Sequence, residues 1–115
     1  MTITLITLLK RREGMSMPDF IAYYEEHHRR IGERVLSGYA SRYVRRFLHP
    51  TDGEDQVHDA DVVMEIDFPD SATRDACFAA MADPEIMGMI VEDEARLFDR
   101  SRIRTFTVEE YASAI

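Results

Sequence analysis

The order of strand-like and helical patterns is the feature that most constrains how this chain can fold. Strand patterns, in which apolar or β-branched residues dominate or alternate, occur at residues 2–9, 40–48, 62–68 and 102–108. Apolar residues recur at helical spacing within residues 16–35, 71–81 and 83–98. The order β-α-β-β-α-α-β predicts an α+β, ferredoxin-like βαββαβ fold, with a four-stranded antiparallel sheet and its helices on one face.

Proline and capping residues predict where the helices begin. Ser16 lies two residues before Pro18, which suits a helix start. Ser71 can cap the helix at 71–81. The run Asp83-Pro84-Glu85 combines a cap, a first-turn proline and an early acid. Residues 49–60 contain turn residues and several acids, so we expect a polar loop there.

The predicted sheet has a second face that the helices do not cover. Along the third strand, alternation places Val63, Glu65 and Asp67 on the face opposite to Val62 and Met64. The other strands imply that this second face is partly hydrophobic, so it needs a partner. We therefore expect a homodimer sealed sheet to sheet.

Length and composition limit the class of protein. A chain of 115 residues predicts a single domain, 1–115, with one hydrophobic core. The 22 acidic residues against 14 basic ones give a formal net charge of −8, which disfavours nucleic acid as a partner. The longest apolar runs fall short of the roughly 20 residues of a membrane helix, and the N-terminus lacks the polarity of a secretory signal. We expect a cytoplasmic protein without a membrane partner.

The run Tyr23-Tyr24-Glu25-Glu26-His27-His28 carries the strongest candidates for chemistry. Histidine is the side chain whose ordinary pKa lies nearest to neutral pH, so a histidine on the buried side of a helix is a candidate acid or base. Tyr24 precedes His28 by one helical turn, so the two side chains can touch. The alternative is that these rings fill the edge of the core, with their polar atoms at its rim.

Metal binding is not predicted. On a regular helix His27 and His28 point about 100° apart and cannot hold one ion together. Cys77 is the only cysteine, which excludes an intrachain disulfide and a thiolate zinc cluster. Cys77 is instead expected to be a small apolar core residue.

Two segments resemble the EthD family. Residues 8–16 followed by the pattern Phe20-x-x-Tyr23-Tyr24-x-x-x-His28 are similar to the opening of that family, and residues 94–102 are similar to its closing segment. Together the two segments bracket nearly the whole chain. The resemblance implies a dimeric α+β barrel, two ferredoxin-like protomers joined through their sheets, with a pocket between sheet and helices in each.

The resemblance also implies a cofactor-free chemistry. His28 lies at the position of the family's pocket histidine, and Tyr43 matches an aromatic position of related muconolactone methylisomerases. Those isomerases use a thiol on the third strand, near Ile66 here, whereas Cys77 lies on a predicted helix. This departure argues against that particular isomerisation. We expect His28 to be catalytic, and Tyr24, Tyr43 and His27 to bind substrate.

Charged residues elsewhere are expected to be structural. Arg45 and Arg46 can face Glu65 and Asp67 across a hairpin of the second and third strands. The run Glu92-Asp93-Glu94 is expected to be a solvated helix face. Asp99, in the family-like closing segment, either orients a histidine or caps a turn.

These observations favour a cofactor-independent lyase or isomerase. The substrate class is a small aromatic or polyketide-like carbonyl compound, with His28 moving the proton and Tyr24 and Tyr43 holding the substrate oxygen. Two alternatives remain open at this point: a cofactor-free monooxygenase of the same barrel type, and a non-catalytic module that binds a small ligand.

Overall fold

The computed structural model describes residues 1–53 and 57–115, and the middle of the predicted polar loop, residues 54–56, lies outside the described residues. Four strands form one sheet: β1 (Ile3–Leu9), β2 (Arg42–Phe47), β3 (Val62–Phe68) and β4 (Arg104–Thr107). The helical elements are α1 (Met17–Tyr23), the π-helical turn η1 (Tyr24–His28), α2 (Arg29–Leu36), α3 (Ser71–Met81), α4 (Pro84–Leu97) and the 3-10 turn η2 (Arg100–Arg102). None of the helices among these residues is both long and apolar enough to cross a membrane.

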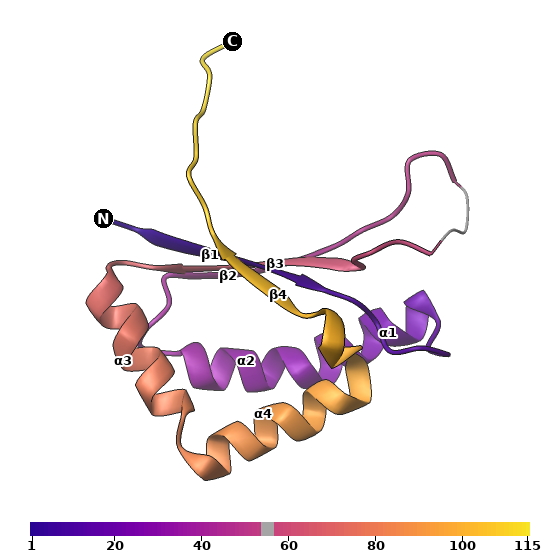
Figure 1. The fold of residues 1–115 in the computed structure, drawn as a ribbon, viewed down its shortest axis with the longest axis horizontal. Helices are drawn as coiled ribbons and strands as arrows, with labels where there is room; N and C mark the ends of the chain where they lie inside the picture. The colour runs from indigo at the N-terminus through magenta and orange to yellow at the C-terminus, as the bar shows by residue number, and fades with distance from the viewer. Residues whose placement is uncertain (54–56) are drawn as a thin grey trace.

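The sheet has the order β2-β3-β1-β4, and every neighbouring pair is antiparallel. All the long helices lie below one face of the sheet (Figure 1). The predicted ferredoxin-like α+β fold is therefore confirmed. The observed β2 and β4 are shorter than the predicted strands 40–48 and 102–108, and η2 takes up the start of the latter.

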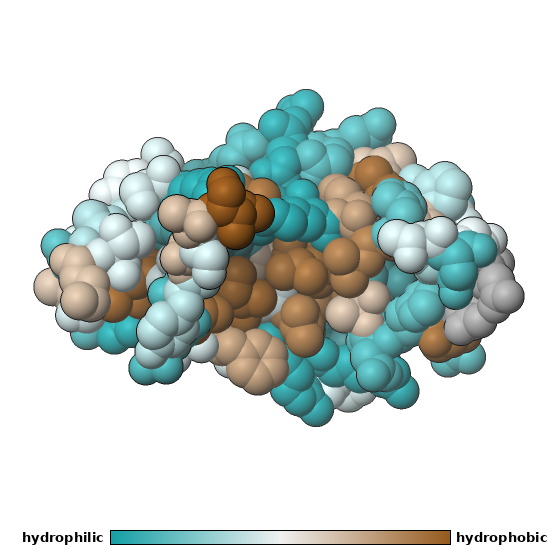
Figure 2. Space-filling view, turned by 90° about the horizontal axis from the view of Figure 1, so that it is seen from above, coloured by the Kyte–Doolittle hydropathy of each residue, from teal (hydrophilic) through white to brown (hydrophobic). Residues whose placement is uncertain are grey.

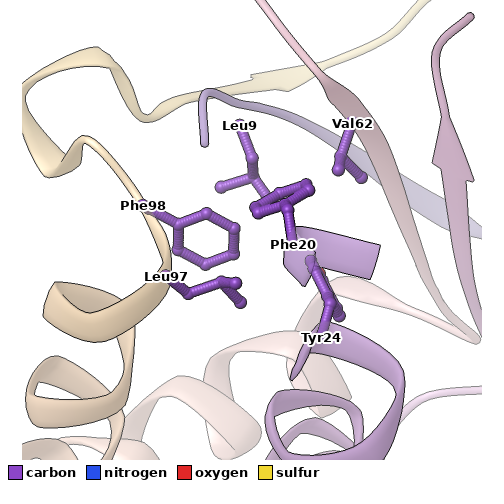
Figure 3. Close-up of a cluster of buried hydrophobic side chains, with 6 residues drawn as sticks. All are labelled: Leu9, Phe20, Tyr24, Val62, Leu97 and Phe98. Atoms are coloured by element: carbon purple, nitrogen blue, oxygen red, sulfur yellow. The ribbon is translucent and has the colours of Figure 1, made fainter. Parts of the chain in front are cut away.

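A buried aromatic cluster joins the first helical segment to the sheet and to the end of α4. Phe20 and Tyr24 are wholly buried, and the ring of Phe20 lies edge-on to those of Tyr24, Phe47 and Phe98. Figure 3 shows Phe20, Tyr24 and Phe98 converging with Leu9, Val62 and Leu97. A second cluster, under the other end of the sheet, contains Leu5, Leu36, Phe68 and Cys77. Fully burying an aromatic or aliphatic side chain contributes about 1.5–3 kcal/mol to the free energy of unfolding. These two clusters therefore fix the helices against the sheet.

The helix starts were predicted correctly at two sites of three. Ser16 caps α1 by accepting a hydrogen bond from the amide of Asp19, and Asp83 caps α4 through Ile86. The prediction for Ser71 was wrong, because Asp70 is the cap and its carboxylate accepts from the amide of Thr73. Asp70 has the extended backbone of a cap, whereas Ser71 is already the first helical residue.

The prediction of a regular helix from Ser16 to Val35 was wrong in its middle. Residues Tyr24–His28 form a π-helical turn between α1 and α2. Such one-turn π segments are rare inside helices and are frequent at functional sites. The turn alters the register of the side chains after Tyr23 relative to an ideal α-helix. His27 and His28 still have different surroundings, as expected: His27 packs on Tyr23, whereas His28 bonds to Asp93.

The opposite face of the sheet is open and carries an apolar band (Figure 2). The register places Ile6, Leu8, Val44, Val63 and Phe106 there, since their strand neighbours belong to the buried clusters. Ion pairs of Glu65 with Arg42 and Arg46 flank the band, as does a hydrogen bond that the Thr4 hydroxyl donates to Asp67.

Arg45 departs from the expected cross-strand pairing. It points to the helix side of the sheet, where it makes a bidentate ion pair with Glu25 at 2.7 and 3.0 Å. This is a consequence of strand alternation, because Arg45 and Arg46 are neighbours and must face opposite sides.

Candidate functional site

His28 and Asp93 form a hydrogen-bonded pair between η1 and α4. The His28 Nδ1 atom lies 2.8 Å from the Asp93 Oδ2 atom, and the two side chains are only 12% and 9% exposed. Because a carboxylate only accepts, Nδ1 carries the donated proton. In neutral imidazole this places the basic lone pair on Nε2.

The Nε2 atom of His28 has no protein partner among the described residues and is not fully buried. Within residues 1–53 and 57–115, the bond from Nδ1 to Asp93 is the only hydrogen bond that the imidazole nitrogens make with protein. No buried side-chain nitrogen or oxygen of this part of the chain lacks a partner, so an unbonded Nε2 is not sealed in. An oriented histidine with an accessible Nε2 is the arrangement required of a general base.

Aromatic rings hold the imidazole in place. The His28 ring lies edge-on to Tyr24 and to Phe98, with centroid distances of 5.2 Å in both cases. Tyr24 comes from η1 and Phe98 from the residue after α4, so the imidazole lies where the helical layer meets the aromatic cluster. Edge-to-face contacts of this kind restrict ring rotation without using polar atoms.

The other carboxylate oxygen of Asp93 is bound by Tyr23. The Tyr23 hydroxyl donates to Asp93 Oδ1 at 2.5 Å. Burial raises the pKa of Tyr23, and the bond to Asp93 raises it further. The phenol is therefore a protonated donor at neutral pH. Tyr23, Asp93 and His28 form a continuous hydrogen-bonded chain, which we call the Asp93 cluster.

Tyr24 and Tyr43 meet beneath the sheet. Tyr24 is wholly buried, and its hydroxyl contacts the Met64 sulfur at 3.5 Å. Burial raises the pKa of Tyr24 well above its ordinary value, and the neighbouring phenol of Tyr43 contributes in the same direction. Burial also raises the pKa of Tyr43, whose ring lies 4.8 Å from the guanidinium of Arg45. We call Tyr24, Tyr43 and Met64 the under-sheet cluster.

His27 lies apart from His28, on the outer side of the helices. Its ring packs on that of Tyr23 with a centroid distance of 4.8 Å, and its side chain is exposed. His27 lines a groove of about 530 Å³ together with Tyr23, Glu26, Arg30, Ile31, Asp93 and Arg96. Tyr23 and Asp93 therefore separate the two histidines.

Asp93 is the residue that the sequence interpretation placed wrongly. It was expected on a solvated face, but it is 6% exposed and bonded to both His28 and Tyr23. The sequence did contain a signal for this. Counted from Ile86, the apolar residues Ile90 and Leu97 lie at i+4 and i+11, and Asp93 lies at i+7, on the same face of the helix. A carboxylate within an apolar stripe needs a buried partner.

Asp99 and Cys77 have structural places. Asp99 accepts from the amide and hydroxyl of Ser101 and so caps η2, and these bonds lower its pKa. It is Asp93, six residues earlier, that orients a histidine. Cys77 lies in the second core cluster, where burial raises the pKa of its thiol. Among the residues described, no group of three or more His, Cys, Asp or Glu side chains is placed to hold a metal ion.

Comparison with known proteins identifies relatives by family and by fold. The EthD domain model matches residues 12–101. An EthD family protein of Bacillus halodurans has 16% identity over 96% of this chain and 100% of its own, with a TM-score of 0.66. An EthD-like protein of Ralstonia eutropha has 16% identity over 93% of this chain and 87% of its own, with a TM-score of 0.63.

A dimeric protein of unknown function from Bacteroides fragilis, with a ferredoxin-like fold, has 9% identity over 93% of this chain and 92% of its own, with a TM-score of 0.57. No curated protein matches the sequence. At these identities the solved structures establish the fold.

Proposed function

The chain belongs to the EthD family, and from this premise we propose that it is a cofactor-independent lyase or isomerase. Its substrate would be a small aromatic or polyketide-like carbonyl compound. One observation carries the proposal: among the described residues, His28 is held through Nδ1 by buried Asp93 while its Nε2 is neither bonded nor fully buried. A buried Asp–His pair of this geometry sets the tautomer and stabilises the imidazolium that forms when Nε2 takes a proton.

The proposed reaction is a proton transfer next to a carbonyl group. Nε2 removes a proton from the carbon beside the carbonyl, and the electron pair of the C–H bond moves into an enolate. In an isomerisation the imidazolium returns the proton to a different carbon. In a dehydration it gives the proton to a departing β-hydroxyl, which leaves as water while the carbon–carbon double bond forms. Both routes balance without a redox partner.

The tyrosines of the under-sheet cluster are proposed to serve the substrate oxygen. Tyr43 is partly exposed, so its hydroxyl is the one we place against the enolate oxygen. Tyr24 is wholly buried, so it would act indirectly, by holding its neighbour Tyr43 in place. His27 is proposed to bind only a substrate that extends past Asp93 into the outer groove.

Turnover of a compound panel tests the proposal. Anthrones, lactones and hydrated polyketides are offered to the wild type, to His28→Gln and to His49→Ala, an exposed histidine outside the site. Loss of a general base lowers the rate by about 10²–10⁴-fold, so His28→Gln should lose turnover while His49→Ala keeps it. Equal turnover in wild type and His28→Gln contradicts the role of His28. Ligand binding with unchanged affinity and no turnover in any protein identifies a binding module.

We also propose that the protein is a homodimer joined through the open sheet face. The apolar band over Ile6, Leu8, Val63 and Phe106 supports this, as Phe106 is 49% exposed in the single chain. Phe106→Glu should give a monomer in analytical ultracentrifugation. Met87→Glu, an exposed apolar position on α4, is the matched control and should leave the mass unchanged. A wild-type monomer at micromolar concentration contradicts the proposal.

A further inference from the structure

Asp93 is held by two donors, one on each carboxylate oxygen. His28 uses Oδ2 at 2.8 Å, and Tyr23 uses Oδ1 at 2.5 Å. The side-chain torsion of a carboxylate is broad, so a single bond to His28 would leave the group free to turn. The second bond comes from Tyr23, the last residue of α1, immediately before the turn η1 that carries His28, and it removes that freedom.

We propose that Tyr23 is a positioning residue for His28 and that it acts through Asp93. The inference rests on the proposed function, since it concerns the same histidine. Both donors stabilise the ionised carboxylate, which is otherwise costly to bury. In the neutral imidazole, a fixed Asp93 carboxylate keeps the proton on Nδ1, which leaves the lone pair on Nε2.

Tyr23 is itself fixed on its other sides. The ring of His27 packs on it with a centroid distance of 4.8 Å, and, against the larger effect of burial, the nearby guanidinium of Arg96 lowers the pKa of the Tyr23 phenol. Arg96 also pairs with Glu92 at 2.7 Å, one turn away on α4. Tyr23 thus links α1 to α4, and the two halves of the site keep their spacing through it.

Tyr23→Phe removes the hydroxyl and keeps the ring. Tyr111→Phe, at an 89% exposed tyrosine of the C-terminal segment, is the matched control. The first measurement needs no substrate: ¹⁵N NMR of the His28 ring, assigned with His28→Gln, reports which nitrogen carries the proton. We expect the Nδ1-protonated fraction to fall in Tyr23→Phe and to stay unchanged in Tyr111→Phe.

The second measurement uses turnover. Tyr23→Phe should lower kcat about 5- to 10-fold, the rate equivalent of one hydrogen bond, with KM kept. Asp93→Asn should lower it further, and the double variant should be no worse than Asp93→Asn, because Tyr23 acts only through Asp93. Thermal unfolding of each variant confirms that the fold is intact.

Two results overturn the inference: unchanged His28 nitrogen shifts in folded Tyr23→Phe, or losses from Tyr23→Phe and Asp93→Asn that add. Failure of the proposed function looks different. If no compound is turned over but the tautomer of His28 shifts in Tyr23→Phe, the positioning role stands and the proton-transfer proposal falls.

Discussion

Tyr23 and Tyr24 are neighbours in sequence, yet their side chains lie in opposite surroundings. Tyr24 belongs to the under-sheet cluster, where its hydroxyl meets a sulfur and another phenol. Tyr23 belongs to the Asp93 cluster, where its hydroxyl meets a buried carboxylate. The first cluster is close to core packing with its polar atoms satisfied, and the second is a polar chain that ends at an open nitrogen.

The difference shows how one helical segment serves both stability and chemistry. The π-helical turn begins at Tyr24, between the two tyrosines. On one side of this point the chain supplies a ring to the aromatic cluster (Figure 3). On the other it supplies a donor to α4. We therefore expect changes at wholly buried Tyr24 to act mainly on stability, and changes in the Asp93 cluster to act mainly on activity. Tyr43, which is partly exposed and placed against the substrate oxygen, should affect both.

The largest expected effect is that of Tyr24→Ala. Removing a wholly buried aromatic side chain leaves a cavity beside Phe20 and Phe98, which costs about 3–5 kcal/mol of unfolding free energy. Urea unfolding measures the loss. Tyr111→Ala, at an exposed site, should stay within about 0.5 kcal/mol of wild type. Similar losses of unfolding free energy in Tyr24→Ala and Tyr111→Ala would contradict the structural role given to Tyr24.

Asp93→Asn should cost less stability and more activity. Replacing the charged acceptor weakens its bonds to His28 and Tyr23, at about 1.5–3 kcal/mol for hydrogen bonds to a charged group. Glu92→Gln, at the neighbouring exposed carboxylate, removes a surface pair and should cost under about 1 kcal/mol. Paired urea unfolding and turnover assays measure both effects. A stability loss equal to that of Tyr24→Ala would contradict the division between the clusters.

Gly32→Ala tests the crowding of the under-sheet cluster. A Cβ at Gly32 would lie 2.6 Å from the Tyr43 hydroxyl oxygen and 2.9 Å from its ring, so the phenol must shift. Such overpacking costs about 1–3 kcal/mol. Gly88→Ala on α4 meets nothing within 4 Å and should stabilise by about 0.5–1 kcal/mol through helix propensity. Thermal unfolding measures both effects. If Gly32→Ala and Gly88→Ala shift the melting temperature in the same direction, the expected clash at Gly32 is contradicted.

Tyr24→Phe should have the smallest effect on stability at neutral pH. The difference in stability between this variant and wild type should increase at alkaline pH. Burial raises the folded-state pKa of Tyr24, so the stability linked to its protonated form is present below the unfolded value of about 10 and is lost as pH rises through the folded value. Wild type should therefore lose more stability than Tyr24→Phe between pH 7 and pH 11 in urea unfolding. Tyr111→Phe should follow wild type, and equal losses in all three proteins would contradict the assignment.

Much of the fold was predictable because its signals are local. The capping residues Ser16 and Asp83 act within one turn, and strand alternation depends on nearest neighbours. The cap at Asp70 was missed because Asp70 and Ser71 are both good caps, and only the backbone conformation distinguishes them. The π-helical turn had no such signal, since it depends on how the helix packs.

The candidate site divides in the same way. By itself the sequence determined the order of elements, the fold, the family resemblance and the choice of His28 as the histidine of interest. Tertiary structure alone decided that Asp93 is the partner of His28, 65 residues away, and that Tyr23 rather than Tyr24 completes the chain. The reason is physical: periodicity assigns a residue to a face, whereas a hydrogen bond requires two faces to meet at a defined distance.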